Sequence, residues 1–176
     1  MKPPADWRTI SDQQLLIHCR WETFRGPGPG GQKRNKTSSA VRITHLPTAL
    51  SAIAMESRSQ HQNRARAFAR LRHRLALELR HPIDLSTFVL PAQLAHLTTA
   101  PDLLAISLRD ENYLPLMGLV VDLLAATHGR LSDTAQLLKT TTANLVRFLE
   151  RDHQLWAKVN QMRHATGLKP LNPSHD

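Results

Sequence analysis

Residues 28–32 read Gly-Pro-Gly-Gly-Gln, and the basic run Lys-Arg-Asn-Lys follows at residues 33–36. Glycine permits backbone conformations that other residues avoid, whereas proline fixes φ and removes a hydrogen-bond donor. Such a run fits neither a helix nor the middle of a packed strand. The stretch is therefore predicted to be a loop that presents its backbone and one glutamine, and the adjacent cations indicate that it approaches a polyanion.

Alternating apolar and polar residues predict short strands on both sides of this loop. An aromatic-rich strand is expected at residues 21–24, leading into the loop. A half-buried strand is expected at residues 39–46, where every second residue from Val41 to His45 faces one side. A weaker return strand is expected at residues 50–55, which are rich in alanine.

Two helices are predicted in the first half of the chain. Ser11 and Gln14 stand at the positions of a capping box, so a helix is expected to begin there. The pattern from residue 58 to about residue 80 is also helical, because apolar residues recur at spacings of three and four. These apolar residues are Ala65, Phe68, Leu71, Leu75 and Leu79.

Positive charge is concentrated in the first half of the chain. Lys and Arg outnumber Asp and Glu by 15 to 5 in residues 1–82, giving a net charge of +10, whereas residues 83–176 carry 8 and 9, giving −1. Cations on one helix face repel one another unless an anion compensates them. This face is therefore predicted to contact nucleic acid, with a merely solvated face as the alternative. Its cations are Arg64, Arg66, Arg70, Arg72, His73, Arg74 and Arg80.

Several short motifs follow one another along residues 20–80. They are Phe-Arg-Gly-Pro-Gly-Pro-Gly-Gly-Gln at 24–32, Asn-Lys-Thr at 35–37, Ser-Ala-Val-Arg at 39–42, Thr-His-Leu-Pro-Thr at 44–48, and Arg-Ser-Gln at 58–60 with Asn63. In order and spacing they resemble the catalytic domain of class I peptide chain release factors. The resemblance implies a small α+β domain, in which a short sheet packs on the long basic helix and the glycine loop projects.

The same resemblance implies a reaction and its partners. The reaction is hydrolysis of the ester between a finished peptide and tRNA, with Gly30, Gly31 and Gln32 as the catalytic residues. The partners are large-subunit ribosomal RNA and P-site peptidyl-tRNA, and Gln32 is a candidate for N5-methylation by a glutamine methyltransferase. No cofactor is implied, and the histidines lack metal-ligand spacing, so no metal is expected. The expected RNA-binding residues are Arg25, Lys33, Arg34, Asn35, Lys36, Arg58, Gln60, Asn63 and Arg64.

The chain departs from the family pattern at Arg34 and in the second strand, residues 49–57, which is poorer in Val and Ile than expected. Arg34 stands where the family usually has a small hydrophobic residue. Only 27 residues precede Gly28, whereas full-length release factors place a long codon-reading region there. The chain is therefore expected to act independently of the codon, as short ribosome-rescue factors of the mitochondrial type do. The alternative is a non-catalytic RNA- or DNA-binding regulator that uses this domain for docking.

Composition bounds the remaining possibilities. The single cysteine, Cys19, excludes an intrachain disulfide framework. No apolar run approaches the roughly 18 residues of a membrane span, and the first residues lack the pattern of a signal peptide. We therefore expect a cytoplasmic protein without a membrane partner. The expected organisation is a catalytic domain at residues 1–82, a proline-punctuated linker at 83–102 and a helical domain at 103–176.

The helical domain has a pattern of its own. Helices expected at residues 132–138 and 143–156, joined by a threonine-rich turn, resemble a helix-turn-helix. In that interpretation Asn144, Arg147 and Arg151 are candidate contacts to nucleic acid. A three-helix bundle that is structural or that docks a protein partner gives the same pattern, so both interpretations stay open.

Overall fold

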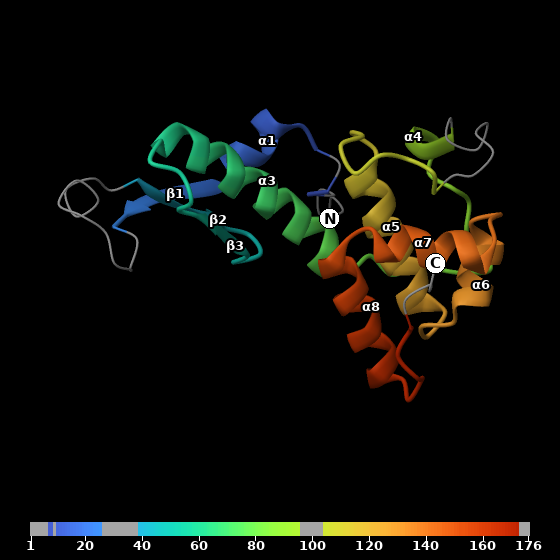
Figure 1. Cartoon of the computed structure of the whole chain (residues 1–176). Coiled ribbons are helices and arrows are strands. Elements are labelled where there is room, and N and C mark those ends of the chain that lie inside the picture. Colours follow the sequence, from blue (N-terminus) through green and yellow to red (C-terminus); the bar gives the residue numbers. More distant parts are fainter. Residues whose placement is uncertain (1–6, 9, 26–38, 96–103, 173–176) are drawn as a thin grey trace. The chain divides into compact units, whose positions relative to one another are not determined.

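The chain divides into two compact units, Met1–Glu78 and Leu79–Asp176, called here the N-terminal unit and the C-terminal unit. Each unit is described by itself (Figure 1). Among the described residues, no helix combines the length and the apolarity needed to cross a membrane. The computed structural model describes residues 7–8, 10–25, 39–95 and 104–172.

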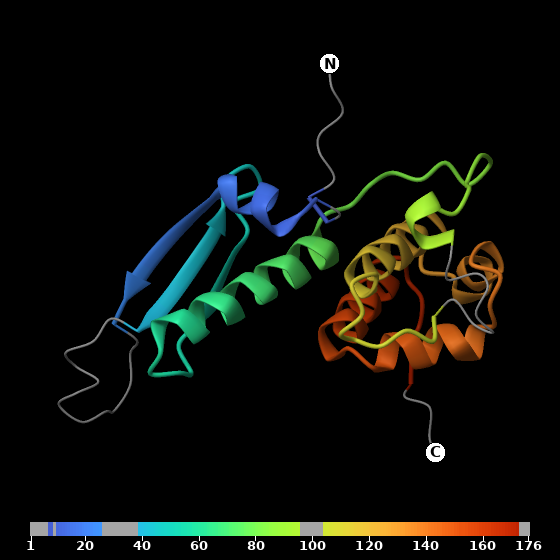
Figure 2. The ribbon, with the colours of Figure 1, turned by 90° about the horizontal axis from the view of Figure 1, so that it is seen from above.

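The N-terminal unit packs a long helix against one face of a three-stranded antiparallel sheet of order β1-β2-β3 (Figures 1 and 2). The predicted combination of a short sheet and a long helix is therefore confirmed. A short helix at the start of the unit precedes the sheet. The elements are α1 (Asp12–Ile17), β1 (Cys19–Phe24), β2 (Ala40–His45), β3 (Ser51–Ala54) and α3 (Gln60–Glu78).

The alternation predicted for the central strand is confirmed. Val41, Ile43 and His45 of β2 are at most 1% exposed, whereas Arg42 between them is exposed. Trp21 of β1 lies opposite Ile43 in the ladder and is half-buried on the same face. One face of the sheet therefore belongs to the core under α3, and the other faces solvent.

The buried stripe of α3 agrees with the predicted one at Leu71 and Leu75 and differs from it in the first half of the helix. Asn63, Ala67, Leu71 and Leu75 recur every four residues, and each is 0% exposed. The predicted core residue Ala65 is exposed, so that expectation is wrong. The buried stripe begins with an amide and an alanine, which hydropathy ranks below the larger apolar residues nearby. Their small size favours a close approach of the helix to the sheet.

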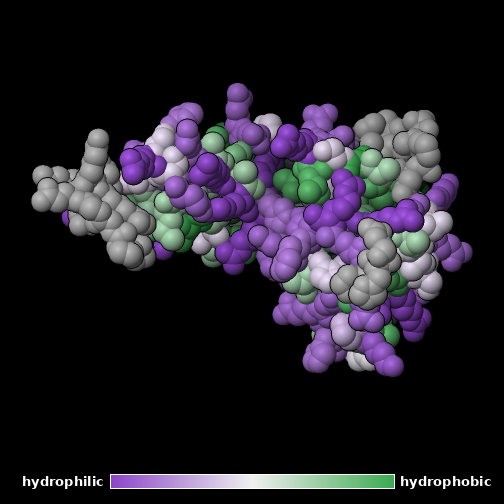
Figure 3. All heavy atoms as spheres, viewed as in Figure 1, coloured by the Kyte–Doolittle hydropathy of each residue, from purple (hydrophilic) through white to green (hydrophobic). Residues whose placement is uncertain are grey.

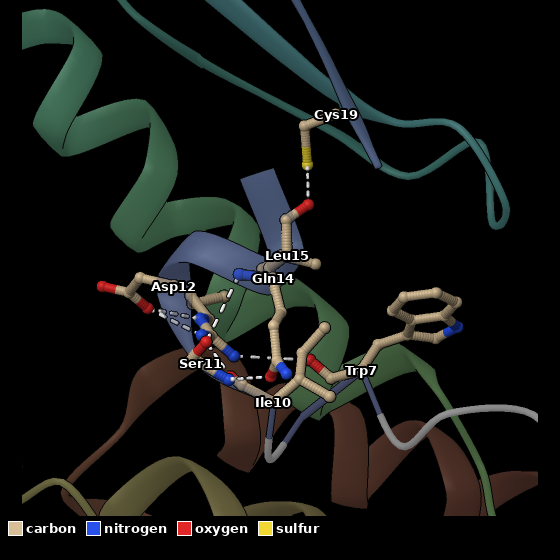
Figure 4. A network of polar contacts seen from close by, with 8 residues as sticks. Trp7, Ile10, Ser11, Asp12, Gln14, Leu15 and Cys19 are labelled. Atoms are coloured by element: carbon tan, nitrogen blue, oxygen red, sulfur yellow. Dashed lines mark hydrogen bonds and ion pairs between the residues drawn. The ribbon is translucent and has the colours of Figure 1, made fainter. Parts of the chain in front are cut away.

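The capping box predicted for α1 is present (Figure 4). The backbone N–H of Gln14 donates to Ser11 Oγ at 3.3 Å, and the backbone N–H of Ser11 donates to Gln14 Oε1 at 3.2 Å. Leu15 is the buried residue of this helix, and its carbonyl accepts from the thiol of Cys19 at 3.3 Å. Burial raises the pKa of that thiol, which keeps it protonated near neutral pH.

His45 makes the N-terminal unit sensitive to acid. Its ring is buried, lies 4.6 Å from the Trp7 ring and bonds to Thr48 Oγ1 through Nδ1 at 2.8 Å. Burial, and secondarily the charge of His18, lower its pKa below the ordinary value of 6.5. The unfolded chain therefore binds the proton more tightly, and the folded state favours the neutral ring.

We expect the stabilisation from neutral His45 to be complete above about pH 6.5 and to fade as the pH falls through the lower folded-state pKa. Urea unfolding between pH 5 and 7.5 measures this. The variant His45→Asn, which does not titrate in this range, should show a shallower pH dependence than the wild type. Equal slopes for the two proteins would contradict the assignment.

The C-terminal unit consists of helices (Figure 1). Its core is apolar and centres on the longest of them, of which Leu116, Val120 and Leu124 are 0% exposed. The carboxylate of Asp122 on that helix is buried and accepts from Arg80 at 2.8 Å and from the backbone N–H of His81 at 3.1 Å. The elements are α4 (Ala92–Ala95), α5 (Tyr113–Ala126), α6 (Leu131–Leu137), α7 (Thr142–Glu150) and α8 (His153–Ala165).

The prediction of a single helix over residues 143–156 is wrong, because the helix is interrupted between α7 and α8. Asp152 begins α8, and its Oδ1 accepts from the backbone N–H groups of Gln154 and Leu155 at 3.0 and 3.1 Å. Its Oδ2 accepts from the Tyr113 hydroxyl at 3.0 Å. Burial, with the Asp152 carboxylate, raises the pKa of Tyr113. Both carboxylate oxygens of the N-cap residue Asp152 thus accept hydrogen bonds, and this N-cap stabilises the start of α8.

Candidate functional site

The predicted catalytic loop is the connection from β1 to β2. Arg25, just before it, is exposed. The two ends of the connection meet at one end of the sheet, since Phe24 pairs with Ala40 in the ladder. Seven of the predicted site residues lie in positions 26–38, outside the described residues: Gly30, Gly31, Gln32, Lys33, Arg34, Asn35 and Lys36.

Two cation–aromatic pairs stand near this end of the sheet. The guanidinium carbon of Arg64, on α3, lies 4.4 Å from the centre of the Trp21 ring on β1. That of Arg42, on β2, lies 5.4 Å from the centre of the Phe24 ring. Strand alternation puts Trp21 and Phe24 on opposite faces of the sheet. Exposed arginines therefore lie over aromatic rings on both faces, a contact that orients a cation without neutralising it.

Arg42 was not among the predicted site residues. Its sequence signals were its place in the Ser-Ala-Val-Arg motif of residues 39–42 and its outward position in an alternating strand. Glu22 lies 3.9 Å from Arg42 and 3.6 Å from Arg20, and all three side chains are largely exposed. Exposed ion pairs of this length contribute little stability and are screened by salt. The outer face of the sheet is thus weakly cationic.

Two further predicted residues are exposed, Arg58 in the turn before α3 and Gln60 at the first position of α3. Ser59 caps the helix, because its hydroxyl accepts from the backbone N–H of Gln62 at 3.3 Å. The hydroxyl of Ser57 accepts from the backbone N–H of Ser59 at 3.0 Å. Serine hydroxyls therefore hold the turn, and its cation and amide extend into solvent.

Asn63 does not lie on the surface as an RNA contact would. It is 0% exposed, and its amide bonds to backbone groups of the protein itself. Nδ2 donates to the carbonyls of Ser39 at 2.7 Å and Ser57 at 2.8 Å, and Oδ1 accepts from the N–H of Ser57 at 3.0 Å. The expectation that Asn63 contacts RNA is corrected accordingly.

Two arginines of the predicted nucleic-acid face cover the edge of the sheet instead. Arg70 donates to the carbonyl of Ile53 at 2.6 Å, and Arg74 donates to that of Ser51 at 2.7 Å. Both carbonyls belong to the edge strand β3, whose outward backbone groups would otherwise be open to pairing. Arg70 also pairs with Glu56 at 2.7 Å, and this hydrogen bond lowers the pKa of the Glu56 carboxyl.

A third arginine of that face, Arg72, anchors the N-terminal segment. It binds Asp12 Oδ1 at 2.6 Å and donates to the carbonyls of Trp7 and Ile10 (Figure 4). The acidic partners missing from the helix sequence thus come from other elements. The cations of this face were expected to repel one another unless an anion compensates them, and at Arg70 and Arg72 the anion is a carboxylate of the protein itself. In Figure 3 hydrophilic side chains nevertheless cover much of the visible face of the N-terminal unit.

In the C-terminal unit, a short turn joins α6 to α7. Lys139 adopts a left-handed backbone conformation there, with φ of 52°. The Thr141 hydroxyl caps α7 by accepting from the N–H of Asn144 at 3.1 Å. Arg147 is exposed and donates to Asn144 Oδ1 at 3.2 Å. Arg151 instead binds the carbonyls of the segment that precedes α5, so its guanidinium is used inside the unit.

Within the described part of the chain, no group of three or more His, Cys, Asp or Glu side chains is placed to hold a metal ion. The candidate site is therefore built from cations, aromatic rings and amides at one end of the sheet. Such a surface suits contact with phosphate groups and bases.

Comparison with known proteins identifies this region. Residues 10–84 match the family model described as RF-1 domain. Peptide chain release factor 2 of Paramagnetospirillum magneticum is 60% identical over 67 residues, which cover 38% of this chain and 18% of that protein. Peptide chain release factor 1 of Leptothrix cholodnii and that of Acidiphilium cryptum are each 59% identical over 56 residues, covering 32% of this chain.

The matched region spans only 16–18% of the length of these relatives. Residues 10–84, which match the family model, contain the Gly-Gly-Gln tripeptide of residues 30–32 and the sheet, turn and helix described above. The comparisons therefore support a domain similar to that of class I release factors at residues 10–84, with this tripeptide in it.

Proposed function

We propose that the chain hydrolyses the ester of peptidyl-tRNA in the ribosome, without reading a codon. The observation that carries the proposal is the RF-1 domain match over residues 10–84, which contains Gly30, Gly31 and Gln32. High identity to release factors over this domain supports the same chemistry.

The proposed reaction needs little from titrating side chains. Water attacks the ester carbonyl carbon, the bond to the ribose oxygen breaks, and the products are a peptide carboxylate and a tRNA with a free ribose hydroxyl. Negative charge develops on the carbonyl oxygen and on the departing oxygen. Gly30 and Gly31 let the backbone approach closely, so that the N–H of Gln32 is directed at this charge. An amide does not titrate near neutral pH, so the Gln32 side chain does not act as a general base. The resemblance to release factors implies that it instead shapes the site so that water is admitted as the nucleophile.

The proposed partners are large-subunit ribosomal RNA and the P-site tRNA. Cationic side chains that neutralise phosphates supply most of the affinity for RNA. Asn63 is left out because its amide is buried, and Arg42 is added because it stands exposed beside Phe24. Gln32 is the proposed target of a glutamine methyltransferase. The proposed contacts are Arg25, Lys33, Arg34, Asn35, Lys36, Arg42, Arg58, Gln60 and Arg64.

Replacing Arg64 with alanine should weaken ribosome binding and lower the slope of log affinity against log salt by roughly one unit, as expected for one lost phosphate contact. Equilibrium binding at several salt concentrations measures the slope. Arg74→Ala is the matched control on the same helix, because the Arg74 guanidinium already donates to the Ser51 carbonyl. An unchanged slope for Arg64→Ala would remove Arg64 from the interface.

The codon-independent form of the proposal is tested by peptide release from ribosomes with labelled peptidyl-tRNA in the P site. The complexes carry a stop codon, a sense codon or no mRNA in the A site, and isolated large subunits form a fourth substrate. We expect release that does not require a stop codon, and the preferred particle identifies the substrate. Release only at stop codons would contradict codon independence while leaving hydrolysis intact.

A second candidate function rests on the turn between α6 and α7. We propose that these helices form a helix-turn-helix, supported by the left-handed Lys139 and by the cap at Thr141. In this alternative the chain is a non-catalytic regulator that docks through its release-factor domain and binds nucleic acid through α7. The near-neutral charge of the second half weighs against strong independent affinity. Ribosome binding without release on any particle would favour this candidate and make the C-terminal unit the place to seek its nucleic-acid or protein partner.

A further inference from the structure

Asn63 joins three separate segments of the N-terminal unit through one side chain. It belongs to α3, and its amide reaches the carbonyl of Ser39 and both backbone groups of Ser57 at 2.7–3.0 Å. Both amide hydrogens and one acceptor position of its oxygen are thus satisfied inside the protein. A buried amide with this many bonds to backbone is held in one orientation, since each lost bond leaves a buried polar group unpaired.

The two partners of Asn63, Ser39 and Ser57, lie next to segments that carry residues of the proposed site. Ser39 is the residue through which the chain enters β2 after the segment that carries Gly30 to Gln32. Ser57 lies in the turn that presents Arg58 and is followed by the start of α3. The Asn63 amide therefore fixes Ser39, at the end of the segment that carries the tripeptide, relative to the turn before α3 and its cation Arg58.

The chemistry of the side chain matters as well as its size. Aspartate has the same shape and can still accept from the Ser57 N–H, but it cannot donate to the two carbonyls. Alanine leaves the carbonyls of both serines and the N–H of Ser57 without the partner that Asn63 supplies. Ala67, one turn further along the same buried stripe, has no polar side-chain atoms and touches neither serine through a hydrogen bond.

We propose that Asn63 is a positioning residue for ester hydrolysis, an inference that rests on the proposed function. It has no exposed surface and so does not contact peptidyl-tRNA. It acts by fixing the Ser39 carbonyl, and with it the point from which the tripeptide segment extends. Misplacement of a catalytic group by about 1 Å can lower a rate by about a hundredfold. Because Arg58 is one of nine proposed RNA contacts, the consequence of losing Asn63 falls mainly on the chemical step and only to a small extent on ribosome binding.

The test compares the full chain with Asn63→Asp, Asn63→Ala and the control Ala67→Gly. Single-turnover peptide release is measured at increasing factor concentration, which separates the maximal rate from the affinity. We expect the two Asn63 variants to lower the maximal rate at least about tenfold and to change the affinity by less than about threefold. Ala67→Gly weakens the helix without removing a hydrogen bond to Ser39, and it should keep the maximal rate.

Hydrogen exchange in the free protein supplies an independent reading. The amide of Ser57, which donates to Asn63, should be protected in the wild type and in Asn63→Asp and should exchange faster in Asn63→Ala. A folded Asn63→Asp variant with the wild-type maximal rate overturns the positioning role. A rate loss matched by Ala67→Gly does so too, because it reflects stability alone. A wild type that binds ribosomes but releases no peptide overturns the proposed function, and the positioning role with it.

Discussion

Replacing Gly30 with alanine is expected to lower the rate of peptide release at least about a hundredfold, the loss typical of removing one preorganised donor from a developing oxyanion. The added Cβ restricts the backbone conformations open at this position and stands where the chain is proposed to approach RNA. Ribosome affinity should change little, because the cations that supply it are untouched. Single-turnover release and equilibrium binding, measured on the same complexes, check both statements.

The control for this comparison is Thr23→Ala, an exposed residue of β1 that has no role in the proposed site. It should release peptide at the wild-type rate. Gln32→Ala tests the second part of the tripeptide, and it should admit nucleophiles larger than water as well as slowing hydrolysis. Gly30→Ala with undiminished release would show that the tripeptide is not the source of the activity.

Replacing Asp122 with alanine is expected to destabilise the C-terminal unit by about 2–3 kcal/mol. The Asp122 side chain is 1% exposed and holds both Arg80 and the backbone N–H of His81. Without it, the N–H of His81 and the partly buried Arg80 charge both lose their contact with the Asp122 carboxylate. The estimate lies below the usual range for a fully buried pair because the Arg80 side chain is 28% exposed and water can reach it.

Hydrogen exchange of the slowest amides of α5 reports this loss for the C-terminal unit alone. The matched control is Asp133→Ala, which removes an exposed carboxylate 3.8 Å from Arg130. That ion pair should be worth less than about 1 kcal/mol. If the two substitutions lowered the stability of the unit equally, the burial of Asp122 would add nothing to its contribution.

The elements of the N-terminal unit could be predicted where the signal was local. The capping box of Ser11 and Gln14 needs only four consecutive residues, and it identified the start of α1. The period-two pattern from Val41 to His45 identified both the strand and its buried face. Such signals act through neighbours in sequence, so no knowledge of the tertiary structure was needed.

The predictions that failed concern contacts between distant segments. Asn63 looked like an exposed residue among cations, but Ser39, which lies 24 positions earlier, draws its amide into the interior. The cations of α3 seemed unpaired because Asp12 and Glu56 lie on other elements. The break before Asp152 depends on Tyr113 as well as on the local cap. The helical periodicity of the sequence does not reveal any of these tertiary partners.

The most direct test of ester hydrolysis is the origin of the oxygen in the released peptide. Ribosomes holding peptidyl-tRNA in the P site are incubated with the full chain in water enriched in oxygen-18, and the peptide is analysed by mass spectrometry. We predict free peptide that carries one heavy oxygen in its carboxylate, together with intact deacylated tRNA. Peptide without the heavy oxygen, or no release while the chain stays bound, would contradict hydrolysis by water at the Gly30-Gly31-Gln32 tripeptide.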